Sequence, residues 1–352
     1  MNPATGKLQK NGVLVTKSKD IGRLHGKSKL GFIVSKDKLL LDFIEACFLC
    51  EENKLIVYDK EERIKCNDLI LLAAQKQERF ETNFLILRDL RRRGHQLQRL
   101  KENPLFTFYT KNQQEPTEPP SLIATFSERE SCTITHLLSL INQTKKQQNK
   151  CWLAIADEEG DITYYELDSQ PLSGKQKPVS FKQTSGILLK DRVLIFDLKI
   201  AQKLHEKEFF GKEFGKALQI SLVEAFYLIK KGFLQIYQPS GKKLSKKNYK
   251  KIIKERQKEI TKRYMVFDDL KNKGLLVKTG FKFGNHFRAY TNHPDKTHAE
   301  YLIHAVLLND SLEWAEVSRA IRLAHSVNKT FLFASVDAEN EINYLFFKRI
   351  RP

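Results

Sequence analysis

Residues 84–94 of this chain read FLILRDLRRRG, and residues 264–274, which lie 180 positions later, read YMVFDDLKNKG. Further blocks match in the same order at nearly the same offset: 55–58 with 234–237, 106–109 with 287–290, and Asp157, Ile162 and Tyr164 with Asp337, Ile342 and Tyr344. Ordered self-similarity of this kind is hard to produce by chance. It predicts a tandem duplication of a unit of about 170 residues.

The duplication predicts how the chain divides. Residues 169–186, DSQPLSGKQKPVSFKQTS, are rich in Ser, Lys, Gln and Pro and have the composition of a linker. We therefore expect an N-terminal repeat over 1–168 and a C-terminal repeat over 187–352. Each repeat is expected to have two lobes, at about 1–78 and 79–168 in the first and at about 187–260 and 261–352 in the second.

Hydrophobic spacing in the second repeat predicts its helices and strands. Helices are expected at 218–229, at 245–273 and after Asp310, which forms a capping-box pattern with Glu313. Strands are expected at 233–237, 275–278, 282–290, 299–307, 330–336 and 341–347. The predicted fold class is α+β twice over, with a helix-led N-terminal lobe and a mixed-sheet, restriction-endonuclease-like C-terminal lobe in each repeat.

The charge balance predicts the kind of partner. The chain has 352 residues, including 61 Lys or Arg and 42 Asp or Glu, which gives a formal net charge of +19. This excess favours a polyanion, and nucleic acid before a membrane, because no stretch approaches the ~18 apolar residues of a membrane span. A source whose proteins are generally rich in lysine is the alternative explanation. The start of the chain has no hydrophobic run, so we expect a cytoplasmic protein.

The cysteines predict neither disulfides nor a metal site. Cys47 and Cys50 have the spacing of a zinc half-site, but no second Cys or His pair follows, and 39–50 has the pattern of an apolar helix face. We therefore expect them to pack in a core. Five cysteines without close pairing are typical of a reducing compartment. No G-x-x-x-x-G-K-[ST] loop occurs, so we expect no nucleotide cofactor, and no other cofactor is predicted.

Five of the nine histidines fall between residues 286 and 325. Of these, His298 stands where a polar loop meets an apolar strand, a position at which scaffolds present reactive groups. Lys329 occupies a similar junction between a helix and a strand. His286 and His293 are expected to be surface or RNA-facing residues, and His304 and His325 to be core residues.

This part of the chain resembles the archaeal tRNA-splicing endonucleases, also called tRNA-intron endonucleases. The resemblance rests on GFKFG at 280–284, FRAY at 287–290, HAEY at 298–301 and the stretch 319–329. It is tight over the C-terminal part of the chain and looser elsewhere. The two fused repeats are similar to the homodimeric branch of the family. The resemblance implies an RNA-cleaving site made of Tyr290, His298 and Lys329.

The same resemblance implies a pair of arginines that clasp a bulged base. Arg322 falls in the matching helix, and both Arg349 and Arg351 qualify as the second arginine, of which we favour Arg349. It also implies a substrate, precursor tRNA with a bulge-helix-bulge motif at its exon-intron junctions. Taken alone, Arg322 is equally a residue of a solvated helix face and Arg349 a residue of a solvated tail.

The chemistry of RNA cleavage suits these residue types. The 2′-hydroxyl of RNA is the nucleophile, so cleavage needs a base, an acid for the departing 5′-oxygen and a cation for the charge on phosphorus. A phenol ordinarily titrates near pH 10, so a tyrosine base needs neighbouring cations such as Lys329. An imidazole titrates near pH 6.5 and suits the acid, here His298. No metal is needed, and the products are a 2′,3′-cyclic phosphate and a 5′-hydroxyl. Taken singly, these residues more often have packing or solvated roles.

The duplication supplies an internal comparison. Tyr109 matches Tyr290, but Asn149 stands opposite Lys329, and the stretch opposite His298, near 119–121, contains no histidine. We interpret the first repeat as a non-catalytic copy in which Tyr109 is a packing residue. A metal-dependent nuclease of the restriction type would need an Asp followed by (Asp/Glu)-x-Lys, and no carboxylate precedes Lys296, Lys329 or Lys348 at that spacing. A non-catalytic RNA-binding or scaffold protein of RNA processing remains the alternative.

Splicing needs two cuts, so one catalytic set per chain predicts a homodimer. The closing strand at 341–347 is more apolar than one sheet face requires, so we expect part of it to pair with another chain. The first repeat also carries an acidic turn made of Asp157, Glu158, Glu159 and Asp161. By resemblance, such a loop docks into a basic pocket of the partner chain; a solvated hairpin turn is the alternative.

Overall fold

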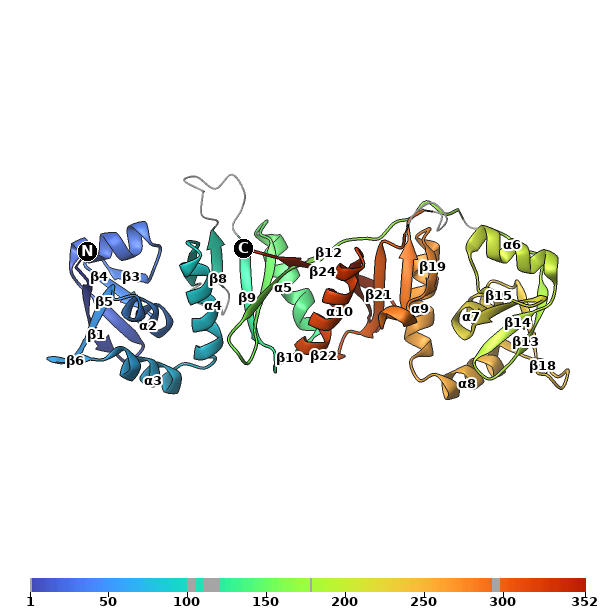
Figure 1. Cartoon of the computed structure of the whole chain (residues 1–352), viewed down its shortest axis with the longest axis horizontal. Coiled ribbons are helices and arrows are strands. Elements are labelled where there is room, and N and C mark those ends of the chain that lie inside the picture. Colours follow the sequence, from blue (N-terminus) through green and yellow to red (C-terminus); the bar gives the residue numbers. More distant parts are fainter. Residues whose placement is uncertain (1, 100–105, 110–120, 178, 293–297) are drawn as a thin grey trace.

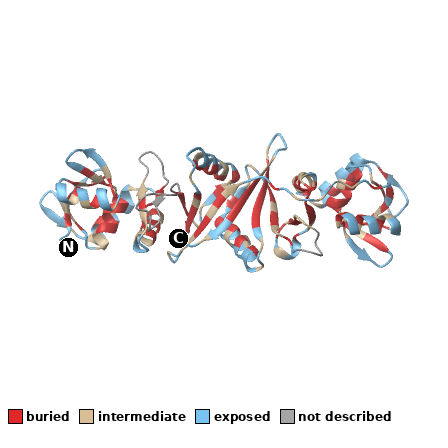
Figure 2. Ribbon diagram, turned by 90° about the horizontal axis from the view of Figure 1, so that it is seen from above, coloured by how far each residue is buried: buried red, intermediate tan, exposed pale blue. Residues whose placement is uncertain are grey.

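The computed structural model describes residues 2–99, 106–109, 121–177, 179–292 and 298–352. Its lobes lie in a row, with the two N-terminal lobes at the ends and the two C-terminal lobes joined in the middle (Figure 1). Buried residues gather in the central sheet and inside each end lobe (Figure 2). No helix of the described part is long and apolar enough to cross a membrane.

The two N-terminal lobes have the same topology. Each contains a six-stranded sheet, ordered β3-β4-β2-β1-β5-β6 in the first repeat and β15-β16-β14-β13-β17-β18 in the second. The first lobe consists of β1 (Ala4–Gln9), β2 (Gly12–Val15), α1 (Ser18–Ile21), the π-helix η1 (Gly22–Lys27), β3 (Phe32–Ser35), β4 (Lys38–Leu41), α2 (Phe43–Glu51), β5 (Leu55–Asp59), β6 (Glu62–Ile64) and α3 (Cys66–Lys76). The second consists of β13 (Thr184–Leu188), β14 (Arg192–Ile195), α6 (Leu198–Glu208), β15 (Lys212–Phe214), β16 (Ala217–Ser221), α7 (Leu222–Lys230), β17 (Leu234–Tyr237), β18 (Lys243–Leu244) and α8 (Lys246–Arg256).

A matching capping box begins the central helix of each N-terminal lobe. Asp42 caps α2 and Ser221 caps α7, and in both cases a glutamate three residues later, Glu45 or Glu224, accepts a hydrogen bond from the capping residue's own N–H. The same local device in the same place supports the tandem duplication. Cys47 lies in α2 and is fully buried in the core, as predicted, and Cys50 is half-buried on that helix.

The C-terminal lobes share one ten-stranded sheet, ordered β19-β20-β21-β23-β24-β12-β11-β9-β8-β7. Helices α4 and α9 pack on one face of it, and α5 and α10 pack on the other. The first repeat contributes α4 (Phe80–Arg92), β7 (Gln96–Arg99), β8 (Phe106–Tyr109), β9 (Ser121–Ser127), β10 (Ser131–Thr133), α5 (Ile134–Lys146), β11 (Cys151–Ala156) and β12 (Ile162–Ser169). The second contributes α9 (Ile260–Asn272), β19 (Leu276–Thr279), the 3-10 helix η2 (Phe281–Phe283), β20 (Phe287–Tyr290), β21 (Tyr301–Leu307), β22 (Ser311–Glu313), α10 (Trp314–Ser326), β23 (Thr330–Val336) and β24 (Ile342–Ile350).

The repeats join through their last strands. β24 pairs with β23 along one edge and with β12 along the other, where Arg349 stands opposite Tyr165. Residues 345–347 are paired on both edges within this chain, so the prediction that the closing strand pairs with another chain is wrong for these residues. Its excess of apolar residues has a different reason: Tyr344 and Phe346 lie in the core that includes α9, while Leu345 and Phe347 lie in the core that includes α10.

The predicted strands at 233–237, 299–307 and 330–336 are confirmed within two residues. Residues 218–229 divide into strand β16 and helix α7, and 245–273 divides at 257–259 into α8 and α9. The prediction that Asp310 and Glu313 form a capping box is wrong. The Asp310 carboxylate accepts a hydrogen bond from the Leu307 N–H at 2.8 Å, and Glu313 ends strand β22.

Candidate active site

Tyr290 is the last residue of β20 and its side chain is 7% exposed. It forms a small apolar cluster with Ala299 and with Leu276, its cross-strand neighbour on β19, and Phe209 packs against this cluster. Phe287 and Ala289 belong to the core that includes α9. Because side chains alternate along a strand, Arg288 and Tyr290 face the opposite side of the sheet. Helix α10 packs on this same side of the sheet, over neighbouring strands.

Lys329 stands between the end of α10 and the start of β23. Asn328 before it takes a left-handed backbone with φ of 52°, and the Lys329 N–H donates to the Ala324 carbonyl at 2.9 Å. The half-buried Lys329 side chain donates to the Val327 carbonyl at 3.3 Å, and its Nζ lies 5.8 Å from the ring centroid of Phe283. Phe283 packs on the core of the α10 face, so Lys329 lies on the same face as Tyr290.

The sheet register brings the three predicted catalytic positions to one end of the sheet. The Glu300 N–H donates to the Ala289 carbonyl at 3.1 Å, and the Thr330 N–H donates to the Glu300 carbonyl at 2.9 Å. Tyr290 and Lys329 therefore adjoin Glu300 from its two sides, with their strands two spacings apart, roughly 10 Å. His298 is exposed and lies two residues before Glu300, at the same end of the sheet.

A cavity of about 320 Å³ lies at the seam between the repeats. Its walls include Lys329, Thr330 and His325 from the second repeat, Lys348 and Arg349 from β24, and Glu166 and Asp168 from β12. Lys329 and Arg349, which are 20 residues apart in the chain, thus line one cavity. The prediction of His325 as a core residue is wrong, because its side chain is exposed at the end of α10.

Arg322 and Arg349 are both exposed, and both lie near enough to Tyr165 of the first repeat for their charges to act on its phenol. Burial raises the pKa of the Tyr165 phenol, while the positive charges of Arg349 and Arg322 oppose that rise. Arg349 stands opposite Tyr165 in the β12–β24 register, and Tyr165 belongs to the core that includes α10, so Arg349 and the α10 residue Arg322 lie on the same side of the sheet. Arg351, the alternative second arginine, is exposed beyond the end of β24.

The acidic turn between β11 and β12 is exposed. The Asp157 carboxylate organises it by accepting the N–H groups of Glu159 at 3.0 Å and Asp161 at 2.8 Å. Glu158 pairs with Arg129 of the same repeat. The second repeat has the corresponding turn between β23 and β24, where Asp337 accepts from Glu339 and Glu341 in the same way.

The first repeat reproduces the backbone of the Lys329 position without its charge. Gln148 has a left-handed φ of 57°, and the Asn149 N–H donates to the Thr144 carbonyl at 2.9 Å, as Lys329 does to Ala324. The Asn149 side chain bonds to Gln147 at 3.2 Å. Tyr109 ends β8 at the position matching Tyr290, but its side chain, like residues 110–120, lies outside the described part of the chain.

His286 is a packing residue, and its prediction as a surface or RNA-facing residue is wrong. Its ring stacks on that of His304 with centroids 4.1 Å apart, and its Nδ1 accepts from the Ala305 N–H at 3.0 Å. Burial, and secondarily the neighbouring His304, lowers the pKa of His286 to about 3. A neutral imidazole fits this interior position. His293 lies outside the described residues.

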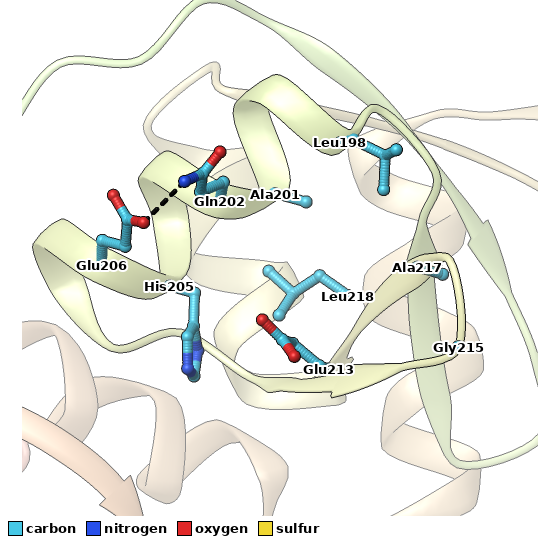
Figure 3. Close-up of a pocket in the computed structure, with 9 residues that line it drawn as sticks. All are labelled: Leu198, Ala201, Gln202, His205, Glu206, Glu213, Gly215, Ala217 and Leu218. Carbon is cyan, nitrogen blue, oxygen red and sulfur yellow. Dashed lines mark hydrogen bonds between the residues drawn. The ribbon is translucent and has the colours of Figure 1, made fainter.

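A further cavity, also of about 320 Å³, lies in the second N-terminal lobe between α6 and the β15–β16 hairpin (Figure 3). Three of its polar side chains are engaged within the lobe: Gln202 donates to Glu206 at 2.7 Å, and His205 bonds to the Phe210 carbonyl at 3.0 Å. None of the predicted site residues lines it. Among the described residues, no group of three or more His, Cys, Asp or Glu could hold a metal ion.

Comparison with known proteins identifies the family. Residues 4–70 and 184–250 each match the tRNA intron endonuclease N-terminal domain, and residues 260–344 match the catalytic C-terminal domain of the same family. The tRNA-splicing endonuclease of Methanosarcina mazei is 30% identical over 270 residues, which cover 75% of this chain and 76% of that protein. This chain belongs to the tRNA-splicing endonuclease family.

Two other archaeal tRNA-splicing endonucleases show how the family unit relates to this chain. The Methanothermobacter thermautotrophicus protein is 37% identical over 172 residues, which are 99% of that protein but 48% of this chain. The Methanococcoides burtonii protein is 35% identical over 231 residues, which span about two thirds of it, 66%, and 64% of this chain. A relative as long as half of this chain agrees with the duplication of an endonuclease unit.

The family's catalytic domain match, 260–344, contains Tyr290, His298, Lys329 and Arg322, and Arg349 follows it. Two residues beside the site were missed from the sequence. Phe209, at the end of α6, packs across the lobe boundary against the cluster that contains Tyr290, and no sequence pattern predicts this contact. Arg288 lies with its guanidinium 6.0 Å from the Tyr290 ring centroid. The sequence does contain a signal for Arg288, because the matching residue of the first repeat is the neutral Thr107.

Proposed function

We propose that this member of the tRNA-splicing endonuclease family cuts precursor tRNA at its exon-intron junctions, within a bulge-helix-bulge motif, without a metal ion. The observation that carries the proposal is the register of β20, β21 and β23, which puts Tyr290 and Lys329 on one face and at one end of the sheet. His298 lies at the same end, on the segment that leads into β21. The net charge of +19 suits an RNA substrate.

In this mechanism the substrate's own 2′-hydroxyl attacks the adjacent phosphorus. Tyr290 takes the proton of that hydroxyl, and His298 gives a proton to the departing 5′-oxygen. Lys329 stabilises the charge that builds on the phosphate oxygens. The 2′-oxygen bond to phosphorus forms as the 5′-oxygen bond breaks, so the products are a 2′,3′-cyclic phosphate and a 5′-hydroxyl. The exposed His298 can reach a solvent-side leaving group.

The assembly follows from the number of sites. One chain carries one Tyr-His-Lys set, because Asn149 replaces the lysine in the first repeat. Excision of an intron requires two cuts, and a two-fold homodimer supplies two identical sites at a fixed separation. We place the protein in the cytoplasm, where its five free cysteines stay reduced.

The test is incubation of the purified protein with an intron-containing precursor tRNA in EDTA, followed by mapping of the RNA ends. We expect cuts at both junctions, with cyclic phosphate and 5′-hydroxyl ends. Intact RNA in EDTA that is cut once magnesium is added contradicts the metal-free mechanism. RNA that is bound but not cut under any condition supports the alternative, a non-catalytic RNA-binding or scaffold protein.

Replacing either clasping arginine should weaken cleavage. A guanidinium plane stacks on an unpaired base, and such stacking contributes roughly 1–3 kcal/mol. Arg322→Ala and Arg349→Ala are therefore expected to lower kcat/KM, and lysine at either position should rescue poorly, because an ammonium group has no plane to stack. Arg319→Ala, one turn earlier on α10 and equally exposed, is the control. Full activity of both lysine variants would show that the arginines are ordinary surface residues.

Charge reversal of the acidic turn should break the homodimer. In the double variant Glu159→Lys and Asp161→Lys, the Asp157 carboxylate that organises the turn stays in place. We expect monomers in sedimentation velocity that still bind RNA but cut it poorly. The control is Glu339→Lys with Glu341→Lys in the corresponding turn of the second repeat, which should leave the dimer intact. An unchanged dimer in the first variant rejects the role of this turn, and a monomeric wild-type protein that makes both cuts rejects the assembly.

A further inference from the structure

A cleft of about 570 Å³ separates the two lobes of the second repeat beside Tyr290. Its N-terminal wall comes from β14, β15, β16 and α7, and its other wall comes from β19 and β20. The charged side chains that line it are Asp191, Arg192, Lys212, Glu224, Lys278 and Arg288. Four are cations and two are carboxylates, so the cleft is positive on balance.

The two carboxylates of the cleft are already engaged. Asp191 pairs with Arg192 at 2.9 Å. Glu224 accepts hydrogen bonds from the N–H groups of Gly211 at 3.0 Å and of Ser221 at 2.8 Å. Lys278 is engaged as well, because its Nζ donates to the carbonyls of Phe209 and Gly211.

Arg288 is the half-buried cation of the cleft that is left without a counter-charge. Its Nε is buried, has no hydrogen-bond partner in the described part of the chain, and no carboxylate described there forms an ion pair with it. It stands directly opposite Lys278 in the β19–β20 register. Burial lowers the pKa of Lys278, and the positive charge of Arg288 lowers it further against the opposing charge of Glu224. Two adjacent cations, one of them unpaired, create a site for an anion.

The first repeat shows that the fold does not require this charge. Gln98 and Thr107 occupy the matching positions, stand opposite one another in the β7–β8 register, and are neutral. Thr107 is 7% exposed. A structural role common to both repeats would suit the same residue type in both, whereas the charged pair occurs in the repeat that carries the Tyr-His-Lys set.

We infer that Arg288 binds a backbone phosphate of the RNA substrate in this cleft, next to the phosphate that is cut. The inference rests on the proposed function, which brings an RNA strand to Tyr290. The guanidinium, 6.0 Å from the Tyr290 ring centroid, is close enough for a phosphate held there to neighbour the reacting one. The strand then passes between the two lobes of the catalytic repeat, and Arg288 orients it for attack.

The test measures binding of a precursor tRNA that carries 2′-deoxyribose at both cleavage positions, so that it cannot be cut. Arg288→Gln should weaken binding about 10-fold, as expected for the loss of a charge-assisted hydrogen bond. It should also reduce the slope of log K against log salt by about 0.7–0.9, the value for one phosphate contact. Arg288→Lys should keep the slope but bind more weakly than wild type, because a lysine cannot bind a phosphate bidentately. Lys10→Gln, an exposed charge in the first N-terminal lobe, should change the affinity little.

Each outcome decides for or against the inference. Wild-type affinity and slope in Arg288→Gln overturn it, and so does an equal loss in Lys10→Gln. If Arg288→Gln does not fold, as judged by thermal melting, Arg288→Lys decides, since wild-type affinity there overturns the inference. The proposed function fails separately, when the wild-type protein binds the unmodified RNA with the expected dependence on Arg288 but leaves it uncut.

Discussion

His298→Ala is expected to lower the single-turnover cleavage rate by about 100-fold or more, the usual scale for a lost general acid. Without an acid the 5′-oxygen must leave as an alkoxide, which is a poor leaving group. RNA affinity should change little, because phosphate contacts elsewhere carry the binding free energy. The measurement is the rate at saturating protein, together with filter binding of the uncleavable RNA described above. The fold should be unaffected, since His298 is exposed.

The duplication provides the matched control for this variant. Asn149→Ala alters the position that corresponds to Lys329 in the first repeat, where the backbone geometry is the same. Its rate and affinity should equal those of the wild-type protein. Equal losses in both variants would contradict the assignment of one catalytic and one non-catalytic repeat.

Lys271→Met is expected to destabilise the protein strongly, by about 3–5 kcal/mol of the free energy of unfolding, because it leaves a buried carboxylate unpaired. Lys271 on α9 pairs with Glu208 at the end of α6, and their side chains are 3% and 5% exposed. Burial lowers the pKa of Lys271, and the charge of Glu208 counteracts this. The pair links the two lobes of the catalytic repeat, and Phe209, the next residue after Glu208, packs against the cluster that contains Tyr290. Urea unfolding measures the loss.

Two further variants separate the pair from general effects. Lys271→Met combined with Glu208→Leu removes both charges and should recover most of the lost stability, since apolar replacements of a buried ion pair are often neutral. Lys273→Met breaks a half-exposed pair with Asp269 on the same helix and should cost less than about 1 kcal/mol. If Lys271→Met and Lys273→Met cost the same, the buried pair has no special part in holding the lobes together.

Some local structure was accessible from periodicity and some was ambiguous. Residues 299–307 and 330–336 are continuous apolar runs, and both form buried strands of the central sheet. Residues 218–229 also have apolar residues at helical spacing, but Leu218 and Ile220 alternate equally well as a strand. The capping residue Ser221 marks where the helix begins, and this signal outweighs the hydrophobic period.

The predicted site combines residues that a motif can name with contacts that it cannot. Tyr290, His298 and Lys329 are recognisable because they lie in the stretches 287–290, 298–301 and 319–329 that carry the family resemblance. Arg288 lies inside the first of these stretches, but its role depends on the lobe across the cleft. The carbonyls of that lobe bind Lys278 and its carboxylates are engaged elsewhere, so Arg288 is left without a counter-charge. His286 looked available for RNA, but the ring of His304, from the neighbouring strand, covers it.

The sequence by itself determined the duplication, the family resemblance and the difference in charge between the two repeats. These are properties of the order of residues along the chain, and a copied unit keeps the spacing of its core positions. Only the tertiary structure decided that β24 pairs with β12 rather than with another chain. The unpaired N–H and C=O groups of a strand edge can pair with any other edge of suitable twist. The partner of β24 therefore depends on where the first repeat lies and not on the residues of β24 itself. Lys329 and Arg349 line one cavity at the seam that this strand pairing creates.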